Sequence, residues 1–145
     1  MSETALAWRE GLSVELLNRF SRNTLVEHLG IELTAIDAEG LCGSMPVDAR
    51  HCQPMRLLHG GASVVLAETL ASVAANALLP EGMAAVGQEI NANHLRSVPE
   101  GGQVTGRARL VHAGTRSQVW NVEIRNAAGQ LTCISRVTMA IVTRR

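Results

Sequence analysis

A single carboxylate stands inside a long apolar segment of the chain. Glu68 lies within residues 61–79, whose other members are mostly Ala, Val and Leu. If this segment is helical, Ser72 and Asn76 follow Glu68 at intervals of four. Thr69 lies beside them, so the polar side chains form one narrow stripe. A charge in such surroundings needs a partner or a function. Two explanations stay open: a structural stripe that faces a water-filled groove or a subunit interface, and a catalytic carboxylate.

The residues before this segment favour the catalytic explanation. The sequence His59-Gly60-Gly61 occupies the expected N-terminal end of the helix, where free backbone N–H groups and the positive end of the helix dipole lie. Glycines let a ligand approach such an end closely. This arrangement suits a carbonyl oxygen that gains negative charge during acyl transfer. Glu68 could then attack the carbonyl carbon or activate a water molecule that does, and Ser72 could hold that water.

The composition indicates one globular domain that covers residues 1–145. Of these residues, 46% are hydrophobic and 18% are charged, and a chain of this length buries a sizeable core. The thirteen basic residues, all of them Arg, balance thirteen acidic residues. We therefore expect neither a nucleic acid nor a membrane as a partner.

The cysteines and the N-terminal residues indicate a cytoplasmic protein. The chain contains three cysteines, an odd number without close paired spacing: Cys42, Cys52 and Cys133. The pair His51-Cys52 lacks the second pair of ligands of a structural zinc site, so we expect reduced thiols and no metal. Residues 1–12 contain charges and no apolar core of signal-peptide length. Residues 61–79 are long enough to span a membrane, but a central Glu is costly there, so a buried helix is expected.

The remaining pattern predicts an antiparallel sheet wrapped around this one long central helix, in the α+β class. Residues 13–30 are typical of one or two short helices, with a capping-box pattern at Thr24 and Glu27. Residues 31–47 predict a hairpin, and an irregular loop leads from there to the long helix. Four strand candidates follow the helix, over residues 83–96, 103–113, 117–126 and 130–142. One sheet and one helix leave an open sheet edge, so we expect a dimer or a larger oligomer.

Alternation along the last two strand candidates predicts that one face of each strand is covered and the other less so. In the third candidate, one face carries Gln118, Trp120, Val122 and Ile124. In the fourth, one face carries Leu131, Cys133, Val137, Met139 and Ile141.

Three segments closely resemble the hotdog-fold acyl-CoA thioesterases: "QPMRLLHGGASVVLAETLAS", "GQEINANHLRS" and "HAGTRSQVWNVEI". The likeness is strongest to the group that contains 1,4-dihydroxy-2-naphthoyl-CoA thioesterase and the proofreading thioesterase of enterobactin synthesis. It runs from about Leu25 to Val142 and leaves a helical extension over residues 1–24 outside. The resemblance implies the hotdog fold, in which the sheet encloses the long helix.

The resemblance also implies a role for each polar residue around the helix start. Glu68 would be the nucleophile or general base, and the Gly60 backbone N–H would polarise the thioester carbonyl. Gln53 and His59 would orient the thioester and water or assist the departing thiolate. Ser72 would position the hydrolytic water.

For coenzyme A, the resemblance implies contacts from two segments: His94 and Arg96 in the first, and Gly114, Thr115 and Arg116 in the second. Arg side chains and the N–H groups of turns suit phosphates, although both arginines also fit ordinary solvated charges at strand ends. Thr115 departs from the Ser that is usual in this group and keeps the hydroxyl.

The expected reaction is hydrolysis of an acyl-CoA or acyl-carrier thioester, at a site that lies in the interface of a dimer or a dimer of dimers, a homotetramer. No cofactor is expected, because coenzyme A is part of the substrate. The acyl pocket should be lined partly by apolar residues near the helix start and beyond its end: Met55, Leu57, Leu58 and Met83. The resemblance favours an aromatic acyl group over a medium-length chain. Two alternatives stay open: a hotdog dehydratase or hydratase, and a non-catalytic acyl-CoA-binding module.

Overall fold

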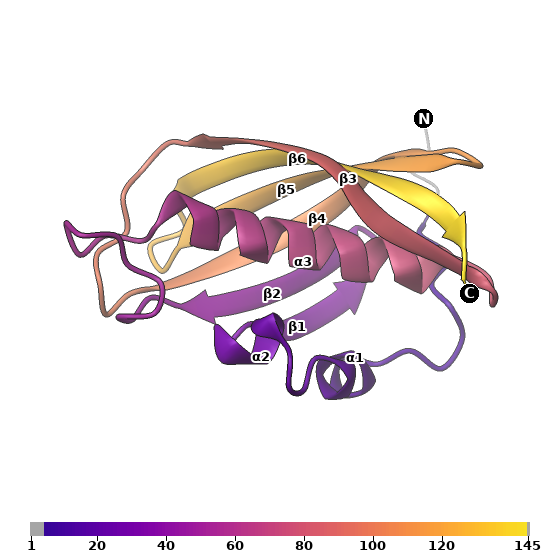
Figure 1. Cartoon of the computed structure of the whole chain (residues 1–145), viewed down its shortest axis with the longest axis horizontal. Helices are drawn as coiled ribbons and strands as arrows, with labels where there is room; N and C mark the ends of the chain where they lie inside the picture. The colour runs from indigo at the N-terminus through magenta and orange to yellow at the C-terminus, as the bar shows by residue number, and fades with distance from the viewer. Residues whose placement is uncertain (1–4, 145) are drawn as a thin grey trace.

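Helix α3 (Gly60–Leu78) crosses the inner face of a curved antiparallel sheet (Figure 1). The computed structural model describes residues 5–144. The sheet order is β1-β2-β4-β5-β6-β3, with the bounds β1 Glu32–Asp37, β2 Gly40–Pro46, β3 Met83–His94, β4 Gln103–Ala113, β5 Ser117–Asn126 and β6 Leu131–Thr143. This arrangement confirms the predicted α+β fold with one central helix.

The alternating strands are covered on one face, as predicted, and this face meets α3. Gln118, Trp120, Val122 and Ile124 are all buried on β5, and the buried residues of β6 include Cys133, Val137 and Met139. The buried Gln118 is satisfied inside the core, since its Oε1 accepts a hydrogen bond of 3.0 Å from Trp120 Nε1. The inner face of the sheet is therefore apolar where α3 covers it.

Helix α3 is long and apolar enough to cross a membrane, but it is the core helix of this fold. Of its most apolar 18-residue window, 44% is buried within the structure. One flank of α3, which borders residues 25–26 and the edge strand β3, stays partly accessible, and side chains of this flank enter the site described below.

Two paired glycines let α3 approach the sheet. Gly43 of β2 lies directly opposite Gly106 of β4, and Leu70 of α3 projects between them. A Cβ atom would lie 2.6 Å from Leu70 Cδ1 at Gly106 and 2.8 Å from Leu70 Cδ2 at Gly43. Larger residues would push the helix outward, so these glycines set the distance between α3 and the sheet.

Two short helices, α1 (Val14–Phe20) and α2 (Leu25–His28), lie beside β1 (Figure 1). Their N-caps are Ser13 and Thr24, whose hydroxyls accept hydrogen bonds of 3.2 Å from Leu16 N and Val26 N.

Of the expected helical extension over residues 1–24, the structure describes residues 5–24, and only α1 is helical there. The irregular segment before it crosses the end of α3: Arg9 N donates to Ala77 O at 2.9 Å, and Arg9 Nη2 donates to Leu79 O at 2.7 Å. This segment therefore ties the chain before α1 to the C-terminal end of α3, while α1 itself packs against β1.

Strand β3 forms one edge of the sheet and pairs only with β6 in the described structure. Its register shifts between Gly87 and Glu89, so Gln88 is an extra residue that has no partner on β6. Twelve residues of edge strand thus present backbone groups that can pair with another chain.

We predict that Leu70→Ala lowers the free energy of unfolding by about 2–5 kcal/mol, because the side chain is fully buried and leaves a cavity between the two glycines. Urea denaturation measures this loss. Gly106→Ala alone should also destabilise, by about 1–3 kcal/mol. The double variant should lose less than the sum of the two, because the new methyl group partly fills the cavity. Additive losses would contradict the described contact, and the exposed Val111→Ala serves as the control.

Candidate active site

The N-terminus of α3 presents an unpaired backbone donor. His59 is the N-cap, and its Nδ1 accepts a hydrogen bond of 2.7 Å from Gly61 N. Ala62 N donates to His59 O at 3.0 Å. The Gly60 N–H, in contrast, has no acceptor among residues 5–144. This free N–H at the positive end of a 19-residue helix can receive a substrate oxygen.

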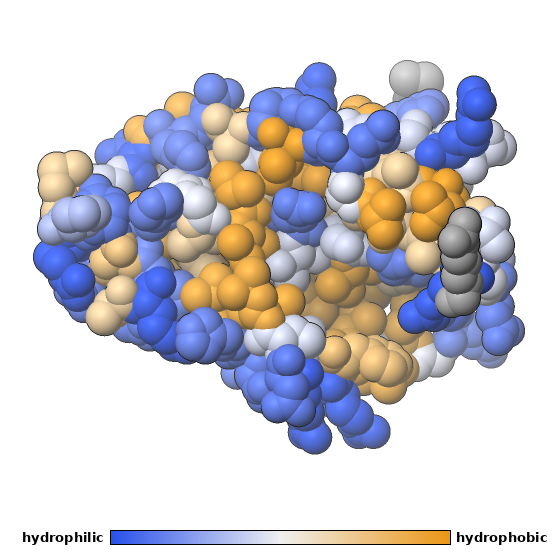
Figure 2. Space-filling view, in the orientation of Figure 1, coloured by the Kyte–Doolittle hydropathy of each residue, from blue (hydrophilic) through white to orange (hydrophobic). Residues whose placement is uncertain are grey.

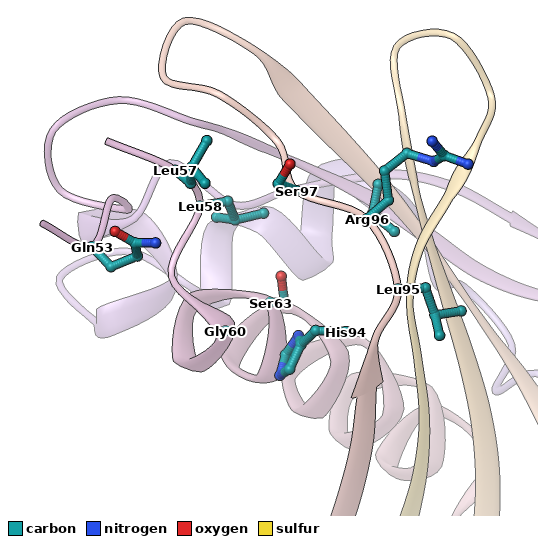
Figure 3. Close-up of a pocket in the computed structure, with 10 residues that line it drawn as sticks. Gln53, Leu57, Leu58, Gly60, Ser63, His94, Leu95, Arg96 and Ser97 are labelled. Carbon is teal, nitrogen blue, oxygen red and sulfur yellow. The ribbon is translucent and has the colours of Figure 1, made fainter. Parts of the chain in front are cut away.

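His94, at the end of β3, lies against the same glycine (Figure 3). A Cβ atom on Gly60 would lie only 2.8 Å from His94 Nε2. Glycine at this position lets His94 lie against the helix start, and a larger residue would displace the imidazole ring.

The loop before α3 holds Gln53 beside this helix start. Gln53 N donates to Leu57 O at 2.9 Å, and its side-chain Oε1 accepts a hydrogen bond from Met55 N. The Gln53 NH₂ group consequently remains available as a donor. Arg56 ties the loop to the segment after β3, since its Nε donates to Glu100 Oε2 at 2.8 Å.

A pocket of about 400 Å³ lies between this loop, the start of α3 and the segment after β3 (Figure 3). Its lining includes four of the residues singled out from the sequence: Gln53, Gly60, His94 and Arg96. Two of the expected acyl-pocket residues, Leu57 and Leu58, line it as well. The guanidinium of Arg96 points away from Gly60 (Figure 3).

Glu68 and Ser72 lie elsewhere, on the accessible flank of α3. They line a separate groove of about 310 Å³ that is otherwise largely apolar. Glu68 lies eight positions after Gly60 in the helix, which is roughly 12 Å along the axis at about 1.5 Å per residue. The expectation that the helix tip and the carboxylate face one groove is therefore not met within a single chain.

The Glu68 side chain is only partly buried, and it lies against β3. A Cβ atom on Gly87 would lie 2.2 Å from Glu68 Oε1 and 3.2 Å from Glu68 Cδ. No hydrogen bond or salt bridge joins this carboxylate to any other residue of the described chain. Gly87 was not singled out in the sequence, although an isolated glycine within a strand pattern indicates a bulge or a close approach.

Asn76, in contrast, has a structural role. Its Nδ2 donates to Ala85 O at 2.9 Å, and its Oδ1 accepts from Ala85 N at 3.0 Å. A second hydrogen bond from Nδ2 reaches Ser72 O at 2.9 Å. The stripe predicted from the sequence thus divides into a structural part at Asn76 and a part around Glu68 that the protein leaves open.

The second expected coenzyme A segment lies far from the first within the chain. Gly114, Thr115 and Arg116 form the turn between β4 and β5, where Gly114 N donates to Ser117 O at 2.8 Å. This turn is at the end of the sheet opposite the N-terminus of α3 (Figure 1). Arg96 and Arg116 therefore lie toward opposite ends of the sheet within one chain.

A larger groove of about 590 Å³ runs between the N-terminal segment and the C-terminal half of α3. Its apolar lining includes Phe20, Val26, Val73 and Met83. Val26 and Val73 also line the groove at Glu68, so the two grooves adjoin each other. Figure 2 shows apolar side chains on this face of the molecule and a hollow beside α1. Sequence inspection predicted Met83 as a lining residue, whereas the expected Met55 is 74% exposed.

The cysteines within residues 5–144 are free thiols and do not belong to a metal-type cluster. No cluster of three or more His, Cys, Asp or Glu side chains could hold a metal ion in this part of the chain. Cys42, Cys52 and Cys133 are free. Burial raises the pKa of the Cys133 and Cys42 thiols above the ordinary value, so both stay protonated at neutral pH.

Comparisons with known proteins agree with this geometry. The model of the Thioesterase superfamily matches residues 55–133. The 1,4-dihydroxy-2-naphthoyl-CoA hydrolase of Escherichia coli is 44% identical over 137 residues, which cover 94% of this chain and 100% of that protein. The proofreading thioesterase EntH of Klebsiella pneumoniae is also 44% identical, over 94% of this chain and 99% of its own length.

Solved structures give the same result. The crystal structure of a thioesterase from Haemophilus influenzae superimposes with a TM-score of 0.90 at 44% identity and covers 94% of each chain. Because the matched length of 137 residues exceeds the span from Leu25 to Val142, the likeness also includes part of the N-terminal segment that was expected to fall outside it. The chain therefore belongs to the Thioesterase superfamily and is a hotdog-fold thioesterase.

Proposed function

We propose that this enzyme hydrolyses acyl-CoA thioesters, with a preference for aromatic acyl groups, at a site assembled from two copies of the chain. The single observation that carries the proposal is the Glu68 carboxylate, which faces an apolar groove without a protein partner in the described chain. The names of the relatives support the substrate class, because one of them hydrolyses an aromatic acyl-CoA.

The need for two copies follows from the distance between the helix tip and the carboxylate. Two β3 edges can pair in antiparallel fashion around a two-fold axis, which extends the sheet across both chains. The two α3 helices then run antiparallel, and the tip of one approaches the flank of the other. Gly60 of one chain thereby comes near Glu68 of the second copy. The tetramer expected from the resemblance would join two such dimers.

In this site, the chemistry requires a polarised carbonyl and a positioned carboxylate. The thioester oxygen accepts a hydrogen bond from the free Gly60 N–H and from the Gln53 NH₂ group. Glu68 then adds to the carbonyl carbon or removes a proton from a water molecule that adds, with Ser72 holding that water. The C–S bond breaks as the carbonyl re-forms, and the thiolate takes up a proton and leaves as coenzyme A. Where Glu68 itself has added, the acyl group stays on its carboxylate as an anhydride, which a water molecule then hydrolyses to the free acid, regenerating Glu68.

His59 is suited to protonating the leaving thiolate. Because its Nδ1 accepts a hydrogen bond from Gly61 N, the neutral ring carries its proton on Nε2. That proton is free to point toward the departing sulfur. No metal or redox cofactor takes part in this scheme.

Coenzyme A itself would bridge the two chains. Arg96 and His94 lie next to the helix tip of one chain. The turn of Gly114, Thr115 and Arg116 lies at the other end of the sheet. In an antiparallel dimer, this turn of the second copy lies toward the helix start of the first. Both segments supply donors for phosphate groups. The three free thiols are consistent with work in a reducing cytoplasm.

The acyl group would extend from Glu68 along α3 into the groove that Phe20 borders. Phe20 is the only Phe in the chain, and it is 74% exposed although it lines an apolar groove. The apolar part of this lining suits an aromatic ring.

Glu68→Ala should lower the rate of thiol release from aroyl-CoA substrates by at least about a hundredfold, because it removes the group that attacks or activates water. Release of the free thiol from a panel of aroyl-CoA, phenylacyl-CoA and fatty acyl-CoA substrates measures this loss. Glu81→Ala, an exposed carboxylate beyond α3, is the control and should leave the rate unchanged. Tight binding by the wild type without turnover would favour the binding module, and altered unsaturation without thiol release would favour a hydratase.

Mixed dimers test whether the site contains residues of both chains. We expect Gln53→Ala and Glu68→Ala chains, each nearly inactive alone, to recover about half of the wild-type rate in doubly tagged dimers. One of the two sites then combines an intact Gln53 with an intact Glu68 from the other chain. Activity is measured after tandem affinity purification, with doubly tagged Glu68→Ala dimers as the control. If each site lies within one chain, every site carries a defect and no activity returns.

Phe20→Ala should change acyl preference without abolishing hydrolysis. Loss of its apolar contact should lower kcat/KM for aromatic acyl-CoA by at least about tenfold relative to acetyl-CoA. Phe20→Leu, which keeps an apolar wall, should shift the ratio less. Equal losses for all acyl groups would mean that the ring supports the fold and does not contact the substrate.

A further inference from the structure

The carboxylate of Glu68 occupies the space that a side chain on β3 would otherwise fill. A Cβ atom on Gly87 would lie 2.2 Å from Glu68 Oε1, well inside van der Waals contact. It would also lie 3.2 Å from Cδ and 3.8 Å from Cγ of the same side chain. The hollow at Gly87 therefore receives the whole end of the Glu68 side chain.

The bulge at Gln88 aligns this hollow with α3. Gly87 pairs with Met139, a buried residue of β6 that faces the helix, whereas Glu89 pairs with the next residue, Thr138. Gln88 is the additional residue, so the alternation of β3 restarts after it. As a result both Gly87 and Ile90 lie on the helix side, and the bulge adds its irregular backbone directly beside the carboxylate.

A separate contact fixes the distance between α3 and this part of β3. The carboxamide of Asn76 forms two hydrogen bonds with the backbone of Ala85, at 2.9 and 3.0 Å. Ala85 lies two residues before Gly87, on the same face of the strand. The hollow consequently cannot widen by a simple outward movement of the helix.

Glu68 has no donor within the described chain that would hold its carboxylate in place. Its position depends on shape alone: the glycine hollow on one side and the groove on the other. We propose that Gly87, together with the bulge at Gln88, is the positioning element for the catalytic carboxylate, which it keeps in the rotamer that faces the thioester. This inference rests on the proposed role of Glu68.

Gly87→Ala tests the inference. The added methyl group should force Glu68 into another rotamer and lower kcat for aroyl-CoA hydrolysis by about tenfold or more, because misplacement of a catalytic group by about 1 Å is that costly. KM should change less than threefold, since the helix tip and the coenzyme A contacts are untouched. Val86→Ala, the neighbouring residue whose side chain is half exposed, is the matched control and should keep the wild-type kcat.

A second test, in the Glu68→Asp variant, separates loss of carboxylate positioning from a general disruption of the fold. In Glu68→Asp the carboxylate is one methylene shorter, so the methyl group of Gly87→Ala fits, and the double variant should have a kcat no lower than that of Glu68→Asp alone. If Gly87→Ala alone does not fold, the double variant should fold, because the clash is gone. Size-exclusion chromatography and thermal unfolding establish folding and oligomeric state for each protein.

The inference is overturned by wild-type kcat in Gly87→Ala, by a loss confined to KM, or by an equal loss in the wild-type and Glu68→Asp backgrounds. These results differ from failure of the proposed function. Full activity of Glu68→Ala would remove the catalytic role of the carboxylate, whereas an inactive Glu68→Ala beside a fully active Gly87→Ala would remove only the positioning role.

Discussion

The packing of α3 against the sheet is the contact on which the other features of this molecule depend. Leu70 enters the space between Gly43 and Gly106 on one side of the helix. On the other side, Asn76 is hydrogen-bonded to both backbone groups of Ala85. Contacts on two sides fix the distance of α3 from the sheet and also its rotation about its own axis. Once that rotation is fixed, the sequence alone decides which side chains point into the open groove.

That fixed rotation explains why the chemistry is divided between two places. The helix tip, with its free N–H at Gly60, opens beside His94 and Gln53. The flank opens beside the N-terminal helices, about two turns further along. In the proposed site, one place supplies the donor for the carbonyl oxygen and the other supplies the carboxylate. The open edge of β3 is the feature of the fold through which a second copy can unite them.

The sequence predicted the architecture well because strands that are covered on one face alternate regularly. Strands β4 and β5 have the predicted bounds, and β3 and β6 differ at their ends. The site was harder to predict. A helical wheel gives the direction of each side chain but not its axial position, which is why Gly60 and Glu68 were expected to share a groove. The separation of Arg96 from Arg116 depends on strand topology, and the hollow at Gly87 depends on a bulge that residue types alone do not reveal.

Hydrogen bonding distinguishes the two members of the polar stripe that looked equivalent in the sequence. Asn76 satisfies its donors and its acceptor on backbone groups, so its polarity is fully explained by its contact with β3. Glu68 lies next to the same strand but receives no hydrogen bond from the described residues. A charged group loses hydration when it enters an apolar groove, and no hydrogen-bond donor in the described chain offsets that loss for Glu68. An open, sterically confined carboxylate is what the proposed catalytic role at a two-chain site requires.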